Sequence, residues 1–94
     1  MEIREIVWLD IFVEKLWRKH NVRIEEVEEM LAARPRVRRV ARGNVGGEDV
    51  YSAMGKTAQG RYLTVFFVLK AGNRALIISG RDMTRRERQR YAKK

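Results

Sequence analysis

Four extended segments separated by short turns constrain the fold of this chain more than any other feature. The segments are predicted at residues 37–41, 50–54, 61–69 and 74–79. Gly and Asn residues mark the turns between them, at 43–47, 59–60 and 71–73. Spacers this short require antiparallel neighbours, because a parallel crossover needs about a dozen residues or more. The segment at 61–69 is apolar on both faces, so we expect it to be the central strand.

The first third of the chain has the periodicity of a short strand followed by two helices. The strand is predicted at 3–8, and the first helix runs from Asp10, its N-cap, to about residue 20, with Asn21 as a left-handed C-cap. Steps of three and four residues place one apolar face on this helix, made of Leu9, Phe12, Val13, Leu16, Trp17 and His20. A second helix follows and ends before Pro35, whose ring prevents it from continuing.

The end of the chain carries a helix-start signal. Thr84 and Glu87 have the spacing of a capping box, which predicts a short helix from Thr84 to about Tyr91. The order of elements indicates one α+β domain over residues 1–94. In this domain two N-terminal helices pack on a curved antiparallel sheet of about four strands, and a short C-terminal helix follows.

Positive charge is concentrated in the second part of the chain. The sequence has 21 Lys and Arg against 12 Asp and Glu, a formal net charge of +9. Residues 1–33 carry a net charge of −3 and residues 34–94 a net charge of +12. Fifteen of the basic residues are Arg, which suits bidentate contact with phosphate. The charge therefore favours a nucleic-acid partner over a membrane, although selection for thermostability or solubility can leave the same composition.

Several classes of protein are excluded by composition. The chain has no Cys and a single His, so it offers no disulfide, no thiolate nucleophile and no Cys-based or two-His metal site. The acidic residues lack metal-ligand spacing, and we expect neither a metal nor another cofactor. The longest apolar run, at 63–69, is too short to span a membrane, and the N-terminus lacks a secretory pattern. A cytoplasmic protein without membrane contact is the expectation.

The Lys19-His20 pair at the end of the first helix is one candidate for chemistry. His20 is the only side chain that titrates near neutrality without help, so it is the natural general acid or base. The alternative is structural, since His20 shares a face with Leu16 and Trp17 and its charged form complements the end of the helix.

Glu48 is a second candidate, in the turn Gly46-Gly47-Glu48-Asp49. Its carboxylate could take the proton of a ribose 2′-hydroxyl group or hold a catalytic Arg in place. The alternative is a hairpin turn that carries two ordinary solvated acids.

The passage from the last strand into the last helix is the third and most specific candidate. A helix N-terminus binds anions through its unpaired N–H groups, and here Arg81, Arg85 and Arg86 accompany it. The alternative is a capped helix whose arginines are solvated or pair with the Glu-rich second helix. With these groups a metal-free ribonuclease is feasible: a base removes the 2′-hydroxyl proton, and arginines neutralise charge on the transition state.

These features occur in an order that resembles a known family. The segments that carry the resemblance are Trp8, Lys19-His20-Asn21-Val22, Glu25-Glu26-Val27-Glu28-Glu29, Gly47-Glu48-Asp49-Val50-Tyr51, Gly60-Arg61-Tyr62-Leu63 and Ile77-Ile78-Ser79-Gly80-Arg81-Asp82-Met83-Thr84, continuing to Glu87-Arg88 and Tyr91. Together they resemble the BrnT family of type II toxin–antitoxin toxins, within the RelE/ParE superfamily. The last segment is the most specific of them.

The resemblance implies a toxin that cleaves RNA and inhibits translation, and a ribbon-helix-helix antitoxin that neutralises it. It suggests that the charged residues named above are the working ones. The residues expected to be catalytic are His20, Glu48, Arg81 and Tyr91. The residues expected to bind RNA phosphate are Lys19, Arg61, Arg85, Arg86 and Arg88.

The first helix departs from the family pattern. Leu9, Phe12 and Leu16 occupy places where members of the family carry polar residues, Asp10 falls one residue late, and Gly80 replaces a small Ala. Two other readings therefore stand beside the nuclease: a non-catalytic module that binds nucleic acid or protein, and an inactive scaffold retained in an antitoxin complex. The apolar first helix, with Ile11 outside its main stripe, also suggests self-association as a homodimer.

Overall fold

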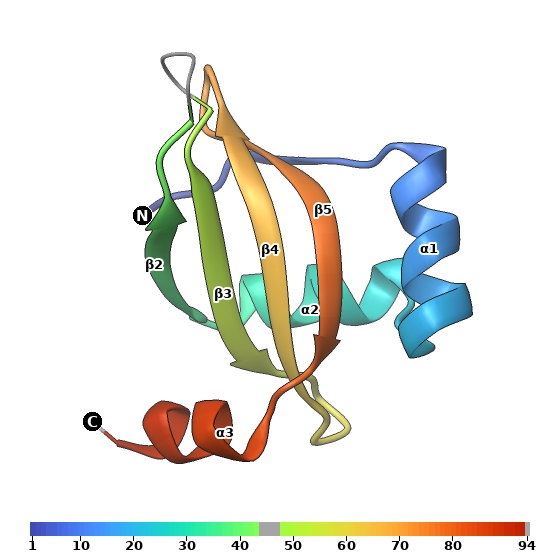
Figure 1. Ribbon diagram of the computed structural model, residues 1–94, viewed down its shortest axis with the longest axis vertical. Helices are drawn as coiled ribbons and strands as arrows, with labels where there is room; N and C mark the ends of the chain where they lie inside the picture. Colours follow the sequence, from blue (N-terminus) through green and yellow to red (C-terminus); the bar gives the residue numbers. More distant parts are fainter. Residues whose placement is uncertain (44–47, 94) are drawn as a thin grey trace.

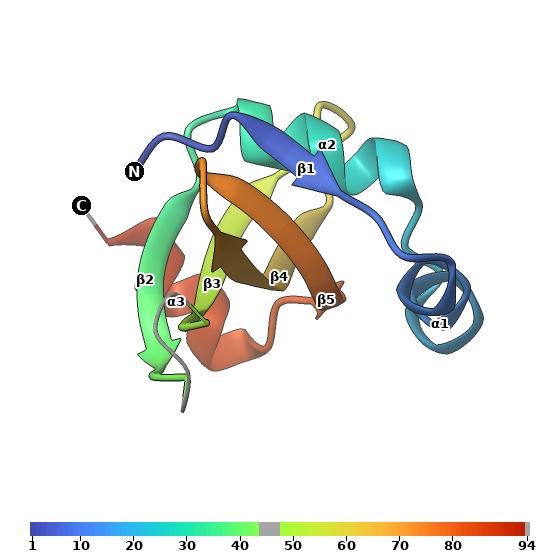
Figure 2. The ribbon, with the colours of Figure 1, turned by 90° about the horizontal axis from the view of Figure 1, so that it is seen from above.

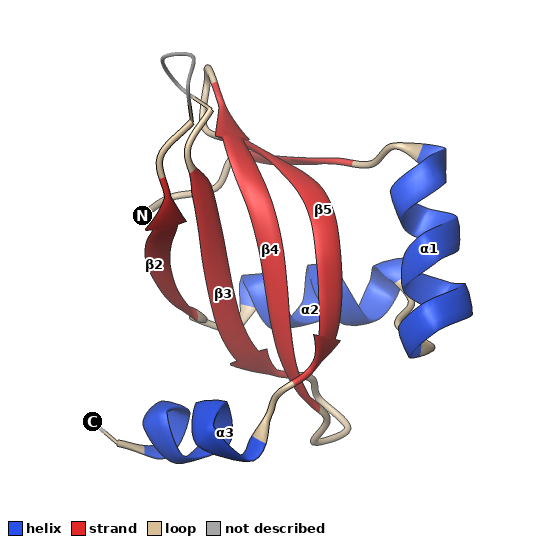
Figure 3. Ribbon diagram, in the orientation of Figure 1, coloured by secondary structure: helices blue, strands red, loops and turns tan. Residues whose placement is uncertain are grey.

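The fold combines a five-stranded sheet with three helices (Figures 1 and 3). The computed structural model describes residues 1–43 and 48–93. Its elements are β1 (Glu5–Val7), α1 (Asp10–His20), α2 (Ile24–Ala32), β2 (Arg36–Ala41), β3 (Val50–Lys56), β4 (Tyr62–Lys70), β5 (Arg74–Asp82) and α3 (Arg85–Ala92). The predicted α+β class is confirmed. The turn predicted at 43–47 lies outside the described residues, apart from Gly43.

The sheet has one strand more than expected and is mixed. Its strand order is β1-β5-β4-β3-β2, so the apolar β4 is the central strand, as predicted. The pairs β2–β3, β3–β4 and β4–β5 are antiparallel, whereas β1 pairs with β5 in parallel. Short turns fix the first three pairings, but most of the chain separates β1 from β5, so no turn dictates their direction.

The end of the last strand also differs from the prediction. β5 continues to Asp82, three residues beyond the expected end at Ser79. Arg81 is therefore a strand residue paired with Thr64 of β4, rather than part of the helix N-terminus. A β-bulge at Ile78 makes the extension possible, because Phe66 and Phe67 pair with Ser79 and Ile77. The capping box of Thr84 and Glu87 is present as predicted.

The three helices occupy different sides of the sheet. α2 crosses one face, α3 lies against the opposite face at its lower end, and α1 stands beside the lower half of β5 (Figures 1 and 2). The upper half of that edge is covered by β1, which pairs only with Arg74–Leu76. Among residues 1–43 and 48–93, α3 is the one helix on the face opposite α2, and it leaves most of that face uncovered. None of the helices in the described residues combines the length and the apolar character that a membrane crossing requires.

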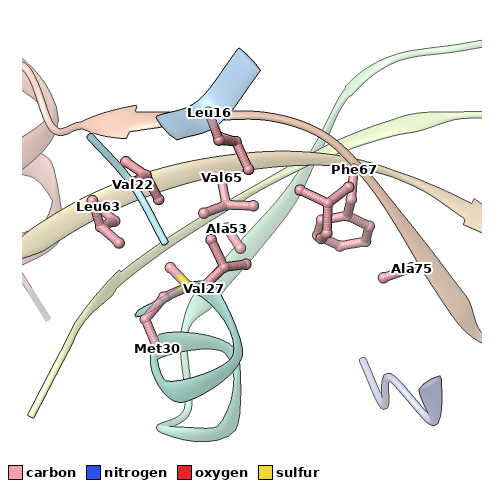
Figure 4. Close-up of a cluster of buried hydrophobic side chains, with 10 residues drawn as sticks. Leu16, Val22, Val27, Met30, Ala53, Leu63, Val65, Phe67 and Ala75 are labelled. Carbon is pink, nitrogen blue, oxygen red and sulfur yellow. The ribbon is translucent and has the colours of Figure 1, made fainter. Parts of the chain in front are cut away.

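The core lies between α2 and the sheet (Figure 4). Val27 and Met30 of α2 are fully buried against side chains from the three central strands, namely Ala53, Leu63, Val65, Phe67, Ala75 and Ile77. Gly55 lets α2 approach closely, since a Cβ atom there would lie 2.9 Å from Met30 Cε. This tight contact fixes the back of the sheet and leaves the other face for function.

α1 is packed much more loosely than the sequence predicts. Leu16 is the buried residue of this helix, and it lies against Gly80, where a Cβ atom would come 3.0 Å from Leu16 Cδ2. Trp17 stays half-exposed, and Leu9 is the N-cap in place of Asp10, with no side-chain cap bond. Asn21 is the left-handed C-cap, as predicted, with a φ of 53°. The expected apolar face of α1 is therefore anchored to the sheet at one residue.

Candidate active site

Strand register arranges the residues of the helix-free face, here called the open face, in rows. Residues paired across neighbouring strands share a face of the sheet. The lower row consists of Arg36, Met54, Thr64 and Arg81. The middle row consists of Arg38, Ser52, Phe66 and Ser79. Both rows begin with an arginine on β2, and the lower row also ends with one on β5.

Arg81 is held in place by Glu87 of α3. Arg81 Nη1 donates to Glu87 Oε1 at 2.6 Å, and Nη2 donates to Oε2 at 3.1 Å. Thr64 Oγ1 and the Thr84 N–H group also donate to Glu87 Oε1, at 3.0 and 2.9 Å. The Glu87 side chain is 13% exposed and that of Arg81 32%. This forked ion pair fixes the guanidinium group at the rim of the open face.

The same contacts set the protonation state of Glu87. The hydrogen bond from Arg81 is the main cause that lowers its pKa, while burial opposes the shift, and the pKa is about 2. Glu87 is therefore a carboxylate at neutral pH and a weak base. The hydrogen bond to Glu87 likewise raises the pKa of Arg81. These contacts suit Glu87 to holding Arg81 in place rather than to accepting a proton at neutral pH.

Arg81 keeps donors for a ligand. A guanidinium group has five N–H bonds. Three of them point to protein acceptors, two to Glu87 and one from Nη1 to the backbone oxygen of Asp82 at 3.3 Å. Within residues 1–43 and 48–93, the N–H at Nε and the second N–H at Nη2 have no acceptor. Two neighbouring N–H groups can bind one phosphate group.

A basic hollow lies along the edge of β5. It has a volume of about 250 Å³ and lies between α1 and β5. Its lining residues are Phe12, Lys15, Leu16, Lys19, His20, Ile78 and Ser79. Ser79 also belongs to the open face, two residues before Arg81 and on the same side of the sheet. The hollow brings the predicted residues Lys19 and His20 together with Ser79, and it includes Lys15, which the sequence did not single out.

Glu48 is not brought together with these residues. Its carboxylate accepts a bond from Lys70 Nζ at 2.8 Å, at the upper end of β4. Arg81 of β5 pairs with Thr64 of β4, and Thr64 lies six residues before Lys70 on that strand. At about 3.3 Å per residue the two positions are roughly 20 Å apart. Glu48, expected to be catalytic, therefore lies far from Arg81, another residue of that set.

Arg61 has a different environment from the one predicted for a phosphate ligand. Its Nε donates to Asp82 at 2.8 Å, and its Nη1 donates to Glu26 at 3.0 Å. Its two Nη atoms also donate to the backbone oxygens of His20 and Asn21, at 2.9 and 2.8 Å. Hydrogen bonding to Asp82 is the main cause that raises the pKa of Arg61. These contacts tie the corner between α1 and α2 to the sheet.

Tyr91 and Arg88 belong to a cluster at the base of the sheet. The rings of Tyr91 and Tyr62 meet edge to face with centres 6.0 Å apart. Arg36 lies 5.8 Å from the Tyr91 ring centre, and Arg88 lies 4.2 Å from that of Tyr62. Arg36 also donates to the backbone oxygen of Arg90 at 3.2 Å. Tyr91 is therefore on the sheet side of α3, one turn beyond Glu87.

The remaining predicted arginines are exposed on α3. Arg85 and Arg86 lie in its first turn, and Arg85 lines a second hollow with Tyr62, Met83 and Arg88. Pairing of the α3 arginines with α2 was the alternative reading, but the two helices lie on opposite faces. Arg61 forms an ion pair with Glu26, and Trp8 donates a hydrogen bond to Glu28. The described residues contain no hydrogen bond or ion pair between the side chains of α2 and α3. They also contain no cluster of His, Asp or Glu that could hold a metal ion.

Sequence reasoning missed the partners that position Arg81. Glu87 was recognised as a helix cap and as part of the family resemblance, but not as the partner of Arg81, and Thr64 was one residue of an apolar strand. Arg36 and Arg38 contributed to the predicted net charge, but the sequence did not assign them to a site. A polar Thr64 within the most apolar strand is the one local signal that could have drawn attention to this position. The register that joins these residues is not encoded in any short motif.

Comparison with known proteins agrees with this architecture. The crystal structure of the Brucella abortus ribonuclease toxin, BrnT, matches with a TM-score of 0.61 at 17% identity, covering 86% of this chain and 97% of that one. At this identity the match shows the fold alone. The comparison with curated proteins gives no match. A family model described as "Ribonuclease toxin, BrnT, of type II toxin-antitoxin system" matches residues 13–87, and the chain therefore belongs to the BrnT family.

Proposed function

We propose that this chain is a metal-independent ribonuclease whose toxicity comes from inhibiting translation and is neutralised by a cognate antitoxin. The observation that carries the proposal is the Arg81–Glu87 ion pair at the rim of the open face, with two N–H groups of Arg81 left for a phosphate. The fold match and the family support the same reading.

In the reaction we propose, Arg81 and the two residues at the end of α1 each have one role. His20 accepts the proton of a ribose 2′-hydroxyl group, whose oxygen attacks the adjacent phosphorus. The bond from phosphorus to the 5′-oxygen breaks, which gives a 2′,3′-cyclic phosphate and a 5′-hydroxyl end once that oxygen takes up a proton. Arg81 stabilises the charge on the phosphorane-like transition state, and Lys19 holds a neighbouring phosphate.

The other predicted residues extend the site along α3. Tyr91 lies one turn beyond Glu87 and close to Arg36, at the lower end of the open face. Arg85, Arg86 and Arg88 are exposed and can follow the backbone of a longer RNA. Glu48 has no part in this scheme because it lies at the other end of the sheet, and Arg61 acts through the position of α1.

Cleavage of a short RNA by purified protein in EDTA tests the proposal. We expect wild type to release 2′,3′-cyclic phosphate ends and Arg81→Ala to cleave roughly 10²- to 10³-fold more slowly. Glu48→Gln is the matched control, a charged residue of the same domain that we expect to leave the rate unchanged. Intact RNA with folded wild-type protein would rule out the nuclease.

A ribbon-helix-helix antitoxin is the partner we propose for the basic surface. An acidic segment of such a partner can occupy the same Arg81 N–H groups as a phosphate. Co-expression with a ribbon-helix-helix protein encoded beside this chain tests the proposal if such a gene exists, and the complex is then expected to lose cleavage activity. Full activity of a stable complex would exclude neutralisation by occlusion of the site.

A further inference from the structure

We propose that Phe66 is a stacking platform for one unpaired RNA base, next to the phosphate bound by Arg81; this inference rests on the proposed function. Phe66 lies on β4, the central strand, and on the open face. It is half-buried, whereas Phe67, the next residue, is fully buried in the core. The strand thus directs one aromatic ring to each face of the sheet.

The neighbours of Phe66 are small. The two residues paired with it across the sheet are Ser52 on β3 and Ser79 on β5. Bulky partners are the rule beside a phenylalanine on a covered face, because cross-strand apolar pairs stabilise a sheet. Here a ring stands between two short polar side chains on a face that α3 covers only at its lower end. The two short neighbours leave room beside the ring for a flat ligand, on the side of the ring that Arg81 does not cover.

The distance between Phe66 and Arg81 suits a single nucleotide. The guanidinium carbon of Arg81 lies over the Phe66 ring, 5.4 Å from its centre, so we expect a base to stack on the opposite side of the ring. A phosphate on the free N–H groups of Arg81 and a base on Phe66 can therefore belong to one nucleotide. Sequence-tolerant recognition of single strands combines a basic groove with aromatic stacking in this way.

Arg38 supplies the next phosphate contact. It begins the middle row on β2, two strands from Phe66, which is a separation of about 10 Å between backbones. Arg38 is exposed, and no carboxylate among the described residues lies within 4.0 Å of it. Its neighbour Arg39, on the other face, pairs with Asp49 at 3.4 Å. Of these two arginines, Arg38 is therefore the one that shares a row with Phe66 and has no carboxylate partner among the described residues.

The contribution of base stacking to binding is measured by comparing two oligonucleotides whose backbones carry equal charge. The first probe is a short 2′-O-methyl oligoribonucleotide, which cannot undergo attack by a 2′-hydroxyl group, and the second is an abasic oligomer of the same length. We expect wild type to bind the first roughly tenfold more tightly. Phe66→Leu should lose most of this preference while binding the abasic oligomer as wild type does, and Phe66→Tyr should restore it.

Val68→Ala is the matched control, since Val68 lies on the same strand and face, one row away, without a ring. Thermal unfolding of each variant shows whether it is folded. Equal binding of both probes by wild type, or full preference in folded Phe66→Leu, would overturn the stacking site and leave the nuclease intact. Failure of wild type to bind either probe would overturn both proposals.

Discussion

Arg61 and Arg81 lie at the same end of the sheet and are both paired with carboxylates, yet they face opposite sides. Arg61 binds Glu26 and Asp82 on the helical side. Arg81, the residue before Asp82, points to the open face and binds Glu87. Four of the five N–H bonds of Arg61 go to protein acceptors, against three for Arg81.

The difference separates an arginine that holds the fold from one that is held by it. Arg61 donates to the backbone oxygens of His20 and Asn21, which are unpaired C=O groups at the end of α1. It compensates for the loose packing of that helix, which buries only Leu16. Arg81 receives its position from Glu87 and keeps two N–H groups without an acceptor among the described residues. Similar pKa shifts therefore accompany different roles.

Replacing each arginine by lysine tests the difference between the two residues, and the largest effect is expected at Arg81. Arg81→Lys keeps the charge but loses the forked geometry, so we expect RNA cleavage to slow by about 10²-fold. The measurement is the single-turnover rate in EDTA, with circular dichroism to confirm folding. A rate within about twofold of wild type would show that the charge alone is sufficient.

Glu87→Gln tests how strongly Arg81 is held. The pKa of Glu87 is about 2 in the folded protein against an ordinary value of 4.5. A lowered folded-state pKa stabilises the protein above the unfolded value, and this stabilisation is lost as the pH falls from about 4.5 toward 2.

At pH 7 we expect the free energy of unfolding of Glu87→Gln to be about 2 kcal/mol below that of wild type, allowing for solvent screening. The gap should close as the pH falls toward 2, because wild type then becomes protonated. Urea unfolding across this range measures it. A gap of constant size would show that the ion pair does not control the difference.

Arg61→Lys is expected to have the smallest effect, and on stability rather than activity. Lys offers one ammonium group in place of the two Nη atoms and Nε, so contacts with the end of α1 are lost. We expect the free energy of unfolding to fall by about 1–2 kcal/mol, measured in urea. The cleavage rate per folded molecule should stay within about twofold of wild type. A rate loss as large as that of Arg81→Lys would abolish the distinction between the two residues.

Local patterns predicted most of the elements. The Gly and Asn turns at 59–60 and 71–73 gave the antiparallel order, and the structure has positive φ angles at Gly60, Gly72 and Asn73. The capping box at Thr84 and Glu87 gave the start of α3. Each of these signals involves groups a few residues apart, whose geometry does not depend on the rest of the chain.

The pattern failed where the outcome depends on distant segments. Asp10 does not cap α1, and on the apolar face of this helix Leu16 is buried against Gly80 whereas Leu9, Trp17 and His20 are exposed. β1 joins the sheet in parallel at an edge that no turn could predict. Loose packing of α1 is a tertiary result, since apolar spacing shows which residues can be buried and not whether a partner surface exists.

By itself the sequence determined the α+β class, the central position of the strand at 61–69, the basic second part and the likeness to the BrnT family. Only the tertiary structure decided which charges meet. The extension of β5 and the bulge at Ile78 place Arg81 opposite Thr64, where both residues contact Glu87. Glu48 contacts Lys70 at the other end of β4 and is therefore far from Arg81. The physical reason is that strand register and edge packing depend on contacts across the whole sheet, whereas caps and turns depend on neighbours in the chain.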